Sequence, residues 1–92
     1  MIAKRVMVRG RVQGVGFRFS MIDAARDAGV VGWVRNRTDG AVEAFVQGDA
    51  AAVERVVSRS RHGPPGARVT EIEAADAPLE PTLRDFSQRA SA

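Results

Sequence analysis

The chain has 92 residues, a net charge of +3 at pH 7 and an apolar share of 45%, which suits one small domain with a single core. It contains no cysteine and one histidine, which excludes disulfides, thiolate metal sites, a cysteine nucleophile and zinc sites built on several histidines. No signal peptide and no membrane-spanning apolar run is visible, so we expect a cytoplasmic protein without a membrane partner.

The first predicted elements are a strand and a helix. Residues 4–12 alternate between apolar and charged side chains, which predicts a strand with Val6, Val8 and Val12 facing a core. Apolar side chains then recur at helical spacing over 18–28 and stop at Gly29, a typical residue for a helix C-cap. Residues 13–17 should therefore form a strand-to-helix turn.

The rest of the chain predicts a hairpin of two strands, a second helix and two further strands. Asp39-Gly40 lies between two valine-rich segments and predicts a hairpin. Asp49 is a good N-cap for a second helix, and Gly63-Pro64-Pro65-Gly66 would end that helix. The predicted elements are strands over 30–36, 41–47, 67–73 and 83–89, with a helix from 49 to about 61 and a polar loop over 74–82.

The order strand, helix, strand, strand, helix, strand predicts a single α+β domain over residues 1–92. A ferredoxin-like, split βαβ arrangement satisfies this order, with an antiparallel four- to five-stranded sheet and two helices packed on one face. The opposite face would present the arginines of the first strand as a solvated surface, beside the aromatic rings of Trp33 and Phe45.

The turn at 13–17 has the composition of an anion site. Gly14 and Gly16 permit positive φ, and N–H groups that gather at a helix N-terminus favour an anion. Arg18 adds a planar fork of donors that suits phosphate. Each feature also has a simpler interpretation: the glycines as a strand-end bulge, Arg18 as a surface arginine, and Asn36 as a side chain that caps the hairpin turn.

The complete pattern resembles the acylphosphatase family. It consists of GRVQGVGFR over 10–18, GVVGWVRN over 29–36 and Asp39-Gly40. Later segments agree with it: Val46-Gln47-Gly48 after the third strand, Gly63-Pro64-Pro65 after the second helix, and a phenylalanine in the last strand. The resemblance extends from about Lys4 to Arg89.

This resemblance implies a ferredoxin-like hydrolase that converts acyl phosphates to a carboxylate and inorganic phosphate. It implies two catalytic residues: Arg18 would hold the phosphoryl group, and Asn36 would orient the attacking water. The implied phosphate cradle consists of Gln13, Gly14, Val15, Gly16, Phe17 and Arg18. In the family, a threonine often follows the asparagine, whereas here the residue is Arg37.

The expected partners are a small acyl phosphate and inorganic phosphate, the latter as product and inhibitor. We expect a monomer with no cofactor, no metal and no nucleic acid. An acyl phosphate is a mixed anhydride with a good leaving group, so positioning and charge stabilisation would suffice for its hydrolysis. Arg18 and the turn would supply the positive field, and the proton of the water would pass to the phosphate of the substrate.

Two other functions use the same fold. One is a nucleic-acid-binding module, since the chain is basic; its third strand offers only Phe45 for stacking, between Glu43 and Gln47. The other is a non-catalytic domain that binds a carboxyl or carbamoyl phosphate within a larger machine. The end of the chain soon after the predicted fold favours a free-standing enzyme over this second alternative.

Overall fold

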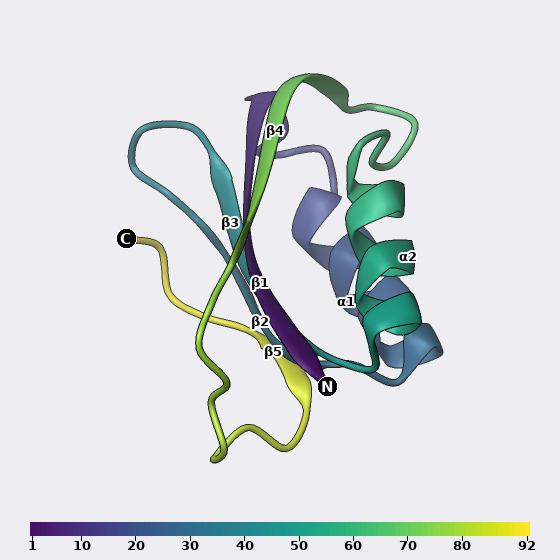
Figure 1. Ribbon diagram of the computed structural model, residues 1–92. Helices are drawn as coiled ribbons and strands as arrows, with labels where there is room; N and C mark the ends of the chain where they lie inside the picture. The colour runs from purple at the N-terminus through teal and green to yellow at the C-terminus, as the bar shows by residue number, and fades with distance from the viewer.

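The computed structural model describes all 92 residues and contains five strands and two helices (Figure 1). In chain order the elements are β1 (Ile2–Arg11), α1 (Phe17–Ala28), β2 (Val31–Asn36), β3 (Val42–Gly48), α2 (Ala50–Ser60), β4 (Arg68–Asp76) and β5 (Phe86–Gln88).

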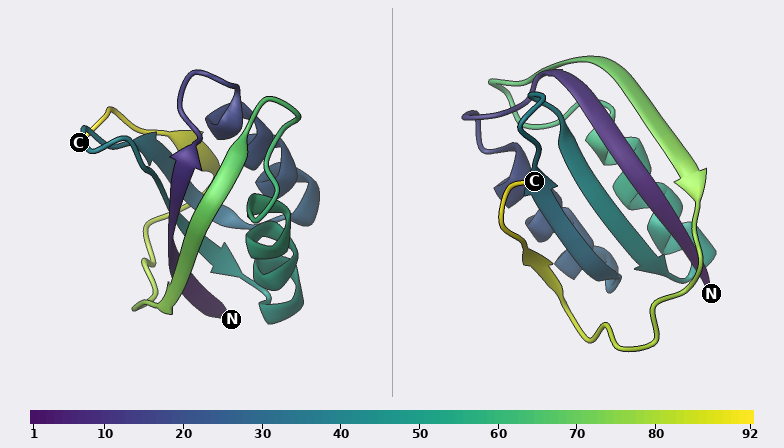
Figure 2. Two further views of the ribbon diagram at one scale, coloured as in Figure 1. Left: turned by 90° about the horizontal axis from the view of Figure 1, so that it is seen from above. Right: turned by 90° about the vertical axis from the view of Figure 1, so that its left-hand side faces the viewer.

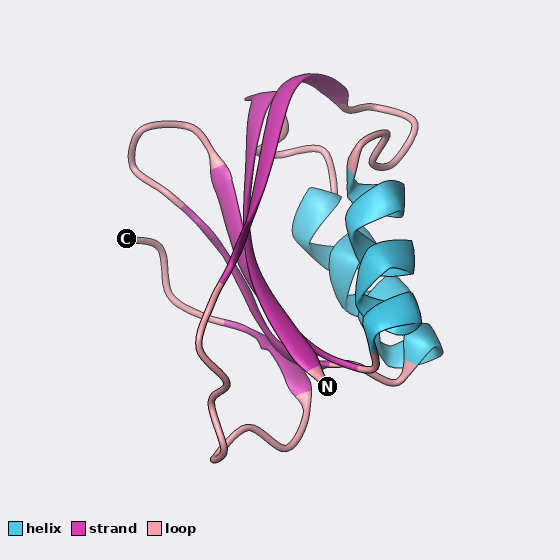
Figure 3. Cartoon of the chain, in the orientation of Figure 1, coloured by secondary structure: helices cyan, strands magenta, loops and turns pink.

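The strands form one sheet in the order β4-β1-β3-β2-β5. The four longer strands pair antiparallel, as predicted, whereas the short β5 pairs parallel to β2 and makes the sheet mixed. Both helices lie on one face of the sheet, which confirms the ferredoxin-like α+β fold (Figures 2 and 3). Neither helix has the length and apolar character that a bilayer crossing requires.

Most element boundaries differ from the prediction by one to three residues. The largest differences, three residues each, are at the end of β4 and the start of β5; β4 continues to Asp76 although we predicted a loop from residue 74. Ladder pairing with β1 explains the extension, because Ala74, Ala75 and Asp76 pair with Val6, Arg5 and Lys4. β1 likewise starts at Ile2 rather than residue 4, because Ile2 pairs with Gly48 of β3. The last strand shortens from 83–89 to 86–88.

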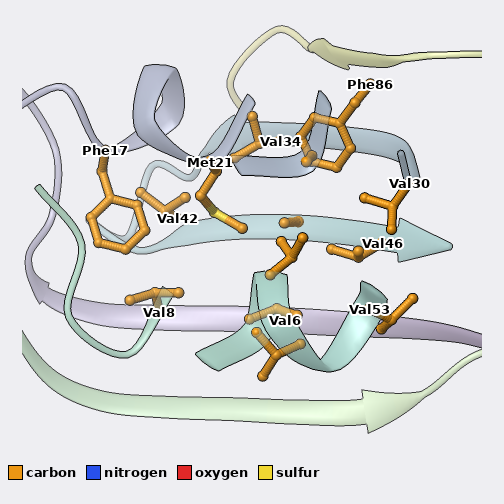
Figure 4. Close-up of a cluster of buried hydrophobic side chains, with 14 of the residues drawn as sticks. Val6, Val8, Phe17, Met21, Val30, Val34, Val42, Val46, Val53 and Phe86 are labelled. Atoms are coloured by element: carbon orange, nitrogen blue, oxygen red, sulfur yellow. The ribbon is translucent and has the colours of Figure 1, made fainter. Parts of the chain in front are cut away.

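The main core fills the space between the sheet and the helices (Figure 4). β1, β3 and β2 contribute alternate side chains to it, and the helices contribute stripes at helical spacing, so period-2 and period-3.6 patterns meet in one layer. Its labelled members in Figure 4 are Val6, Val8, Phe17, Met21, Val30, Val34, Val42, Val46, Val53 and Phe86.

The face of the sheet away from the helices is only in part the solvated surface that we predicted: Arg5 and Arg11 of β1 are exposed, but the aromatic rings and Glu43 are buried. Trp33 and Phe45 stack there with ring centroids 6.3 Å apart, and each is only 8% exposed. The carboxylate of Glu43, which is fully buried, accepts hydrogen bonds from Arg5 at 2.6 Å and Arg35 at 2.8 Å. The segment between β4 and β5 contributes to the burial of the rings, because Ala77 and Leu83 pack against the cluster that the rings form with Ala3.

The charge of Glu43 is stabilised by its arginine partners. Burial alone would raise the pKa of the Glu43 carboxyl, but hydrogen bonds from Arg35 and Arg5 and their positive charges outweigh it and hold the pKa below its usual value. Arg37 adds a third contact at 3.4 Å. The arginines of β1 and β2 therefore neutralise a buried carboxylate in addition to facing solvent.

Candidate active site

The predicted turn and the predicted asparagine lie at the same end of the sheet. β1 and β2 both pair antiparallel with β3, so they run in the same direction and finish together. The register places Val8 of β1 opposite Val42 of β3, and Val42 opposite Asn36, the last residue of β2. In Figure 1 the loop from β1 to α1 and the hairpin from β2 to β3 accordingly appear at the end of the sheet away from the N-terminus.

The turn has the backbone geometry expected of an anion cradle. Gly14 has φ +73° and Gly16 has φ +81°, both in the left-handed region that favours glycine. Gly16 is the N-cap of α1, and the hydrogen bond from Ser20 N to Gly16 O, 3.0 Å long, opens the helix. The N–H groups of residues 13–16 donate no hydrogen bond to other backbone groups, and the first-turn N–H groups of a helix are unpaired by construction.

Three side chains fix this turn to the rest of the fold. The Gln13 Nε2 amide donates to Arg37 O at 2.7 Å and to Ala41 O at 2.9 Å, which fastens the turn to the β2–β3 hairpin. Phe17, only 2% exposed, enters the core on the side of Val8 and Val42 (Figure 4). Val15 packs against the same core. The unpaired N–H groups are thus held on a rigid support.

Arg18 is available to a ligand. It makes no salt bridge within the chain, in contrast to Arg5 and Arg9, which pair with Glu43 and Asp39. It borders a cavity of about 130 Å³ at the N-terminus of α1, several times the roughly 30 Å³ that one water occupies in the liquid. The cavity is lined by Val12, Gly14, Gly16, Phe17, Arg18, Phe19 and Gln88.

Asn36 lies on the sheet face that carries the helices, because it alternates in phase with Val34. Its Oδ1 atom is buried and has no hydrogen-bond partner. The hairpin turn is capped instead by Asp39, whose Oδ1 accepts from Ala41 N at 3.0 Å. The Asn36 side-chain oxygen therefore accepts no hydrogen bond that would cap the turn. Asn36 does not border the cavity of Arg18 directly; it lies at the adjacent strand end.

The hairpin beside Asn36 carries an ion pair between Arg37 and Asp39. The N–H of Ala41 and the Arg37 guanidinium lower the pKa of Asp39, and Asp39 in turn raises the pKa of Arg37. Arg37 thus bonds to Asp39 and Glu43 through its side chain and to Gln13 through its carbonyl. No group of three or more His, Cys, Asp or Glu side chains is gathered in a way that would hold a metal ion.

Three features of the site were not predicted from the sequence. The side-chain contacts of Gln13 depend on a hairpin 24 residues away and carried no local signal. Gln88 could have been found, because it alternates in phase with the buried Phe86 and so shares the helix-side face. Phe19 could have been found too, because it lies out of phase with the buried helical positions 17, 21, 24 and 25.

Comparisons of sequence and of structure both match this chain to acylphosphatases. Residues 4–88 match the family model for acylphosphatase. The chain is 54% identical over 83 residues to an acylphosphatase of Acidiphilium cryptum, covering 88% of this chain and 91% of that protein. It is 49% identical over 83 residues to an acylphosphatase of Paraburkholderia xenovorans, covering 90% and 86%. The crystal structure of acylphosphatase from Bacillus subtilis superimposes with a TM-score of 0.92 at 36% identity, covering 97% of this chain and 99% of that one.

Proposed function

This chain belongs to the acylphosphatase family, and we propose that residues 13–18 and Asn36 form the site with which it hydrolyses acyl phosphates to a carboxylate and inorganic phosphate. The observation behind this assignment is the turn itself. Two left-handed glycines leave a row of unpaired N–H groups at the N-terminus of α1, next to an arginine without an internal partner.

The turn and Arg18 bind the phosphoryl group in this proposal. Unpaired N–H groups at a helix N-terminus attract negative charge, and the Arg18 guanidinium can donate to two phosphate oxygens at once. Because the turn that carries the N–H donors is anchored by Gln13 and Phe17 before substrate arrives, these N–H groups stabilise charge on the equatorial oxygens without reorganisation.

Asn36 orients the nucleophile. Its buried, unpartnered Oδ1 can accept a hydrogen bond from a water molecule and hold it in line with the bond to the leaving carboxylate. A neutral amide is a poor base, so the proton of the water goes to a phosphate oxygen of the substrate. The P–O bond to the carboxylate breaks as the bond to water forms, and the carboxylate leaves without protonation.

Further properties belong to the same proposal. Arg18 and the turn amides provide the positive field for the phosphoryl group, so catalysis needs no metal. Inorganic phosphate occupies the same donors and inhibits competitively. The protein acts as a monomeric single domain in the cytoplasm. A nucleic-acid-binding role is disfavoured because Trp33 and Phe45, at 8% exposure each, offer little ring surface to a base.

The decisive experiment measures phosphate release from benzoyl phosphate by the purified protein, with and without excess chelator. We expect saturable turnover that the chelator does not change. Absence of turnover would overturn the enzymatic role, and activity that disappears in chelator and returns with magnesium or zinc would overturn the metal-free mechanism.

A further inference from the structure

We propose that Phe19 contacts the acyl part of the substrate and makes the enzyme selective for acyl phosphates with flat, apolar acyl groups. This inference rests on the proposed function, because it assumes that the phosphoryl group binds at the turn and Arg18. It adds a specificity-determining residue and a substrate class to that site.

Phe19 has a distinctive place at the start of α1. The helix begins at Phe17 and turns its buried side, with Phe17 and Met21, toward the sheet. Phe19 lies two residues after Phe17, about 200° around the helix, and therefore outside this buried stripe, on the side where the helix shares a cavity with Gln88 of β5. Helical side chains also lean toward the N-terminus, so the ring lies over the turn that precedes the helix.

The ring borders the same cavity as Arg18. Phe19, Gly14, Gly16 and Arg18 all line the cavity of about 130 Å³. The Phe19 side chain is nevertheless 77% exposed, more than any other large apolar side chain except Met1. Isolated apolar side chains on a surface are common and need no ligand. The position of Phe19 is what matters, because its ring forms an apolar rim directly beside the expected phosphate donors.

The geometry of an in-line displacement places the acyl group against the apolar rim that Phe19 forms. In an in-line displacement, the leaving group departs on the side of the phosphorus opposite to the attacking water. Asn36, which orients the water, ends β2 and does not line the cavity, whereas Phe19 lines it from α1, together with Gln88 of β5. The acyl group therefore extends outward past Phe19, where a flat apolar group can stack on the ring and a small acyl group cannot.

A comparison of two substrates tests this inference. We would measure kcat and KM for benzoyl phosphate and for acetyl phosphate in wild type and in Phe19→Ala. We expect KM for benzoyl phosphate to rise roughly two- to tenfold, the range of one aromatic contact, with kcat and all constants for acetyl phosphate unchanged. Loss of uniform binding raises KM and leaves kcat alone.

Leu79→Ala is the matched control, because Leu79 is 49% exposed and lines a different cavity, with Met1 and Ile2. It should alter neither substrate. An unchanged ratio of kcat/KM between the two substrates in Phe19→Ala would overturn the inference while leaving the proposed function intact. If wild type hydrolysed neither substrate, the proposed function would fail, and the inference with it.

Discussion

The Asn36 side chain ends β2 with a buried oxygen that accepts no hydrogen bond from the protein. A buried polar atom without a partner is costly, on the order of 1–3 kcal/mol, so folding alone gives no reason to place an amide here. Water held for reaction gives one. The neighbouring Asp39 performs the structural task of the hairpin and leaves Asn36 free for this role.

We predict that Asn36→Ala lowers kcat by at least about a hundredfold, the scale of losing one preorganised contact in the transition state. Its inhibition by inorganic phosphate should stay near the wild-type value, because Arg18 and the turn are untouched. Steady-state kinetics with phosphate as inhibitor separates the two effects. Asp39→Ala is the control: it should lower the Tm, because the hydrogen bond to Ala41 N is lost, and keep turnover. Near wild-type kcat in Asn36→Ala would remove the proposed mechanism for the water.

At the scale of elements, the turn between β1 and α1 combines two left-handed residues with three anchors. Gly14 and Gly16 supply the backbone curvature, while Gln13, Val15 and Phe17 fasten the turn to the hairpin and the core. A Cβ built on Gly14 or Gly16 meets nothing within 4 Å. A side chain added at either position would therefore strain the backbone and lie on the ligand side of the turn, but it would not clash with the protein.

Gly16→Ala and Gly29→Ala form a matched pair at the two ends of α1. Both glycines are left-handed caps, with φ +81° and +75°, and both have open space around the position of a Cβ. Each substitution should lower the free energy of unfolding by about 1–2 kcal/mol. Only Gly16→Ala should also weaken phosphate inhibition and reduce kcat/KM. Equal activity in the two variants, measured at a temperature where both are folded, would contradict the role of the turn.

At the scale of the whole molecule, Glu43 connects the sheet on the face that the helices leave open. Its carboxylate lies on β3 and binds Arg5 of β1 and Arg35 of β2. Arg37 also contacts Glu43, and its backbone carbonyl accepts a hydrogen bond from the Gln13 side chain. A chain of contacts thus runs from the buried carboxylate through the hairpin to the phosphate cradle.

This cluster predicts a defined response to acid. Because the folded-state pKa of Glu43 is lowered, its contribution to stability is complete above the unfolded pKa of about 4.3 and disappears as the pH falls through the folded value. Glu43→Gln should lower the free energy of unfolding by about 1–3 kcal/mol at pH 7, the scale of lost hydrogen bonds at a buried polar group. Below pH ~4.3 the free energy of unfolding should fall less steeply in the variant than in wild type. Urea unfolding across pH provides the test; a variant as stable as wild type would show the cluster to be neutral.

Local patterns were sufficient to predict most of the architecture. The valine alternation in β1 and β3, the Asp39-Gly40 hairpin and the Gly29 cap all lie where their periodicity or turn chemistry placed them. The burial of Glu43 was not predictable in this way, because its partners come from two other strands. The extension of β4 to Asp76 likewise depends on pairing with β1 rather than on its own composition.

The central claim is that Arg18 and the turn bind the phosphoryl group, and the affinity for inorganic phosphate tests it most directly. Competitive inhibition and the phosphate-dependent rise in Tm should both be present in wild type. In Arg18→Ala we predict phosphate binding weaker by at least about tenfold, the scale of a lost charge-assisted hydrogen bond, with an unchanged Tm in phosphate-free buffer. Arg61→Ala removes the same charge from an exposed residue at the end of α2 and should bind phosphate like wild type. Wild-type phosphate affinity in Arg18→Ala would contradict the account.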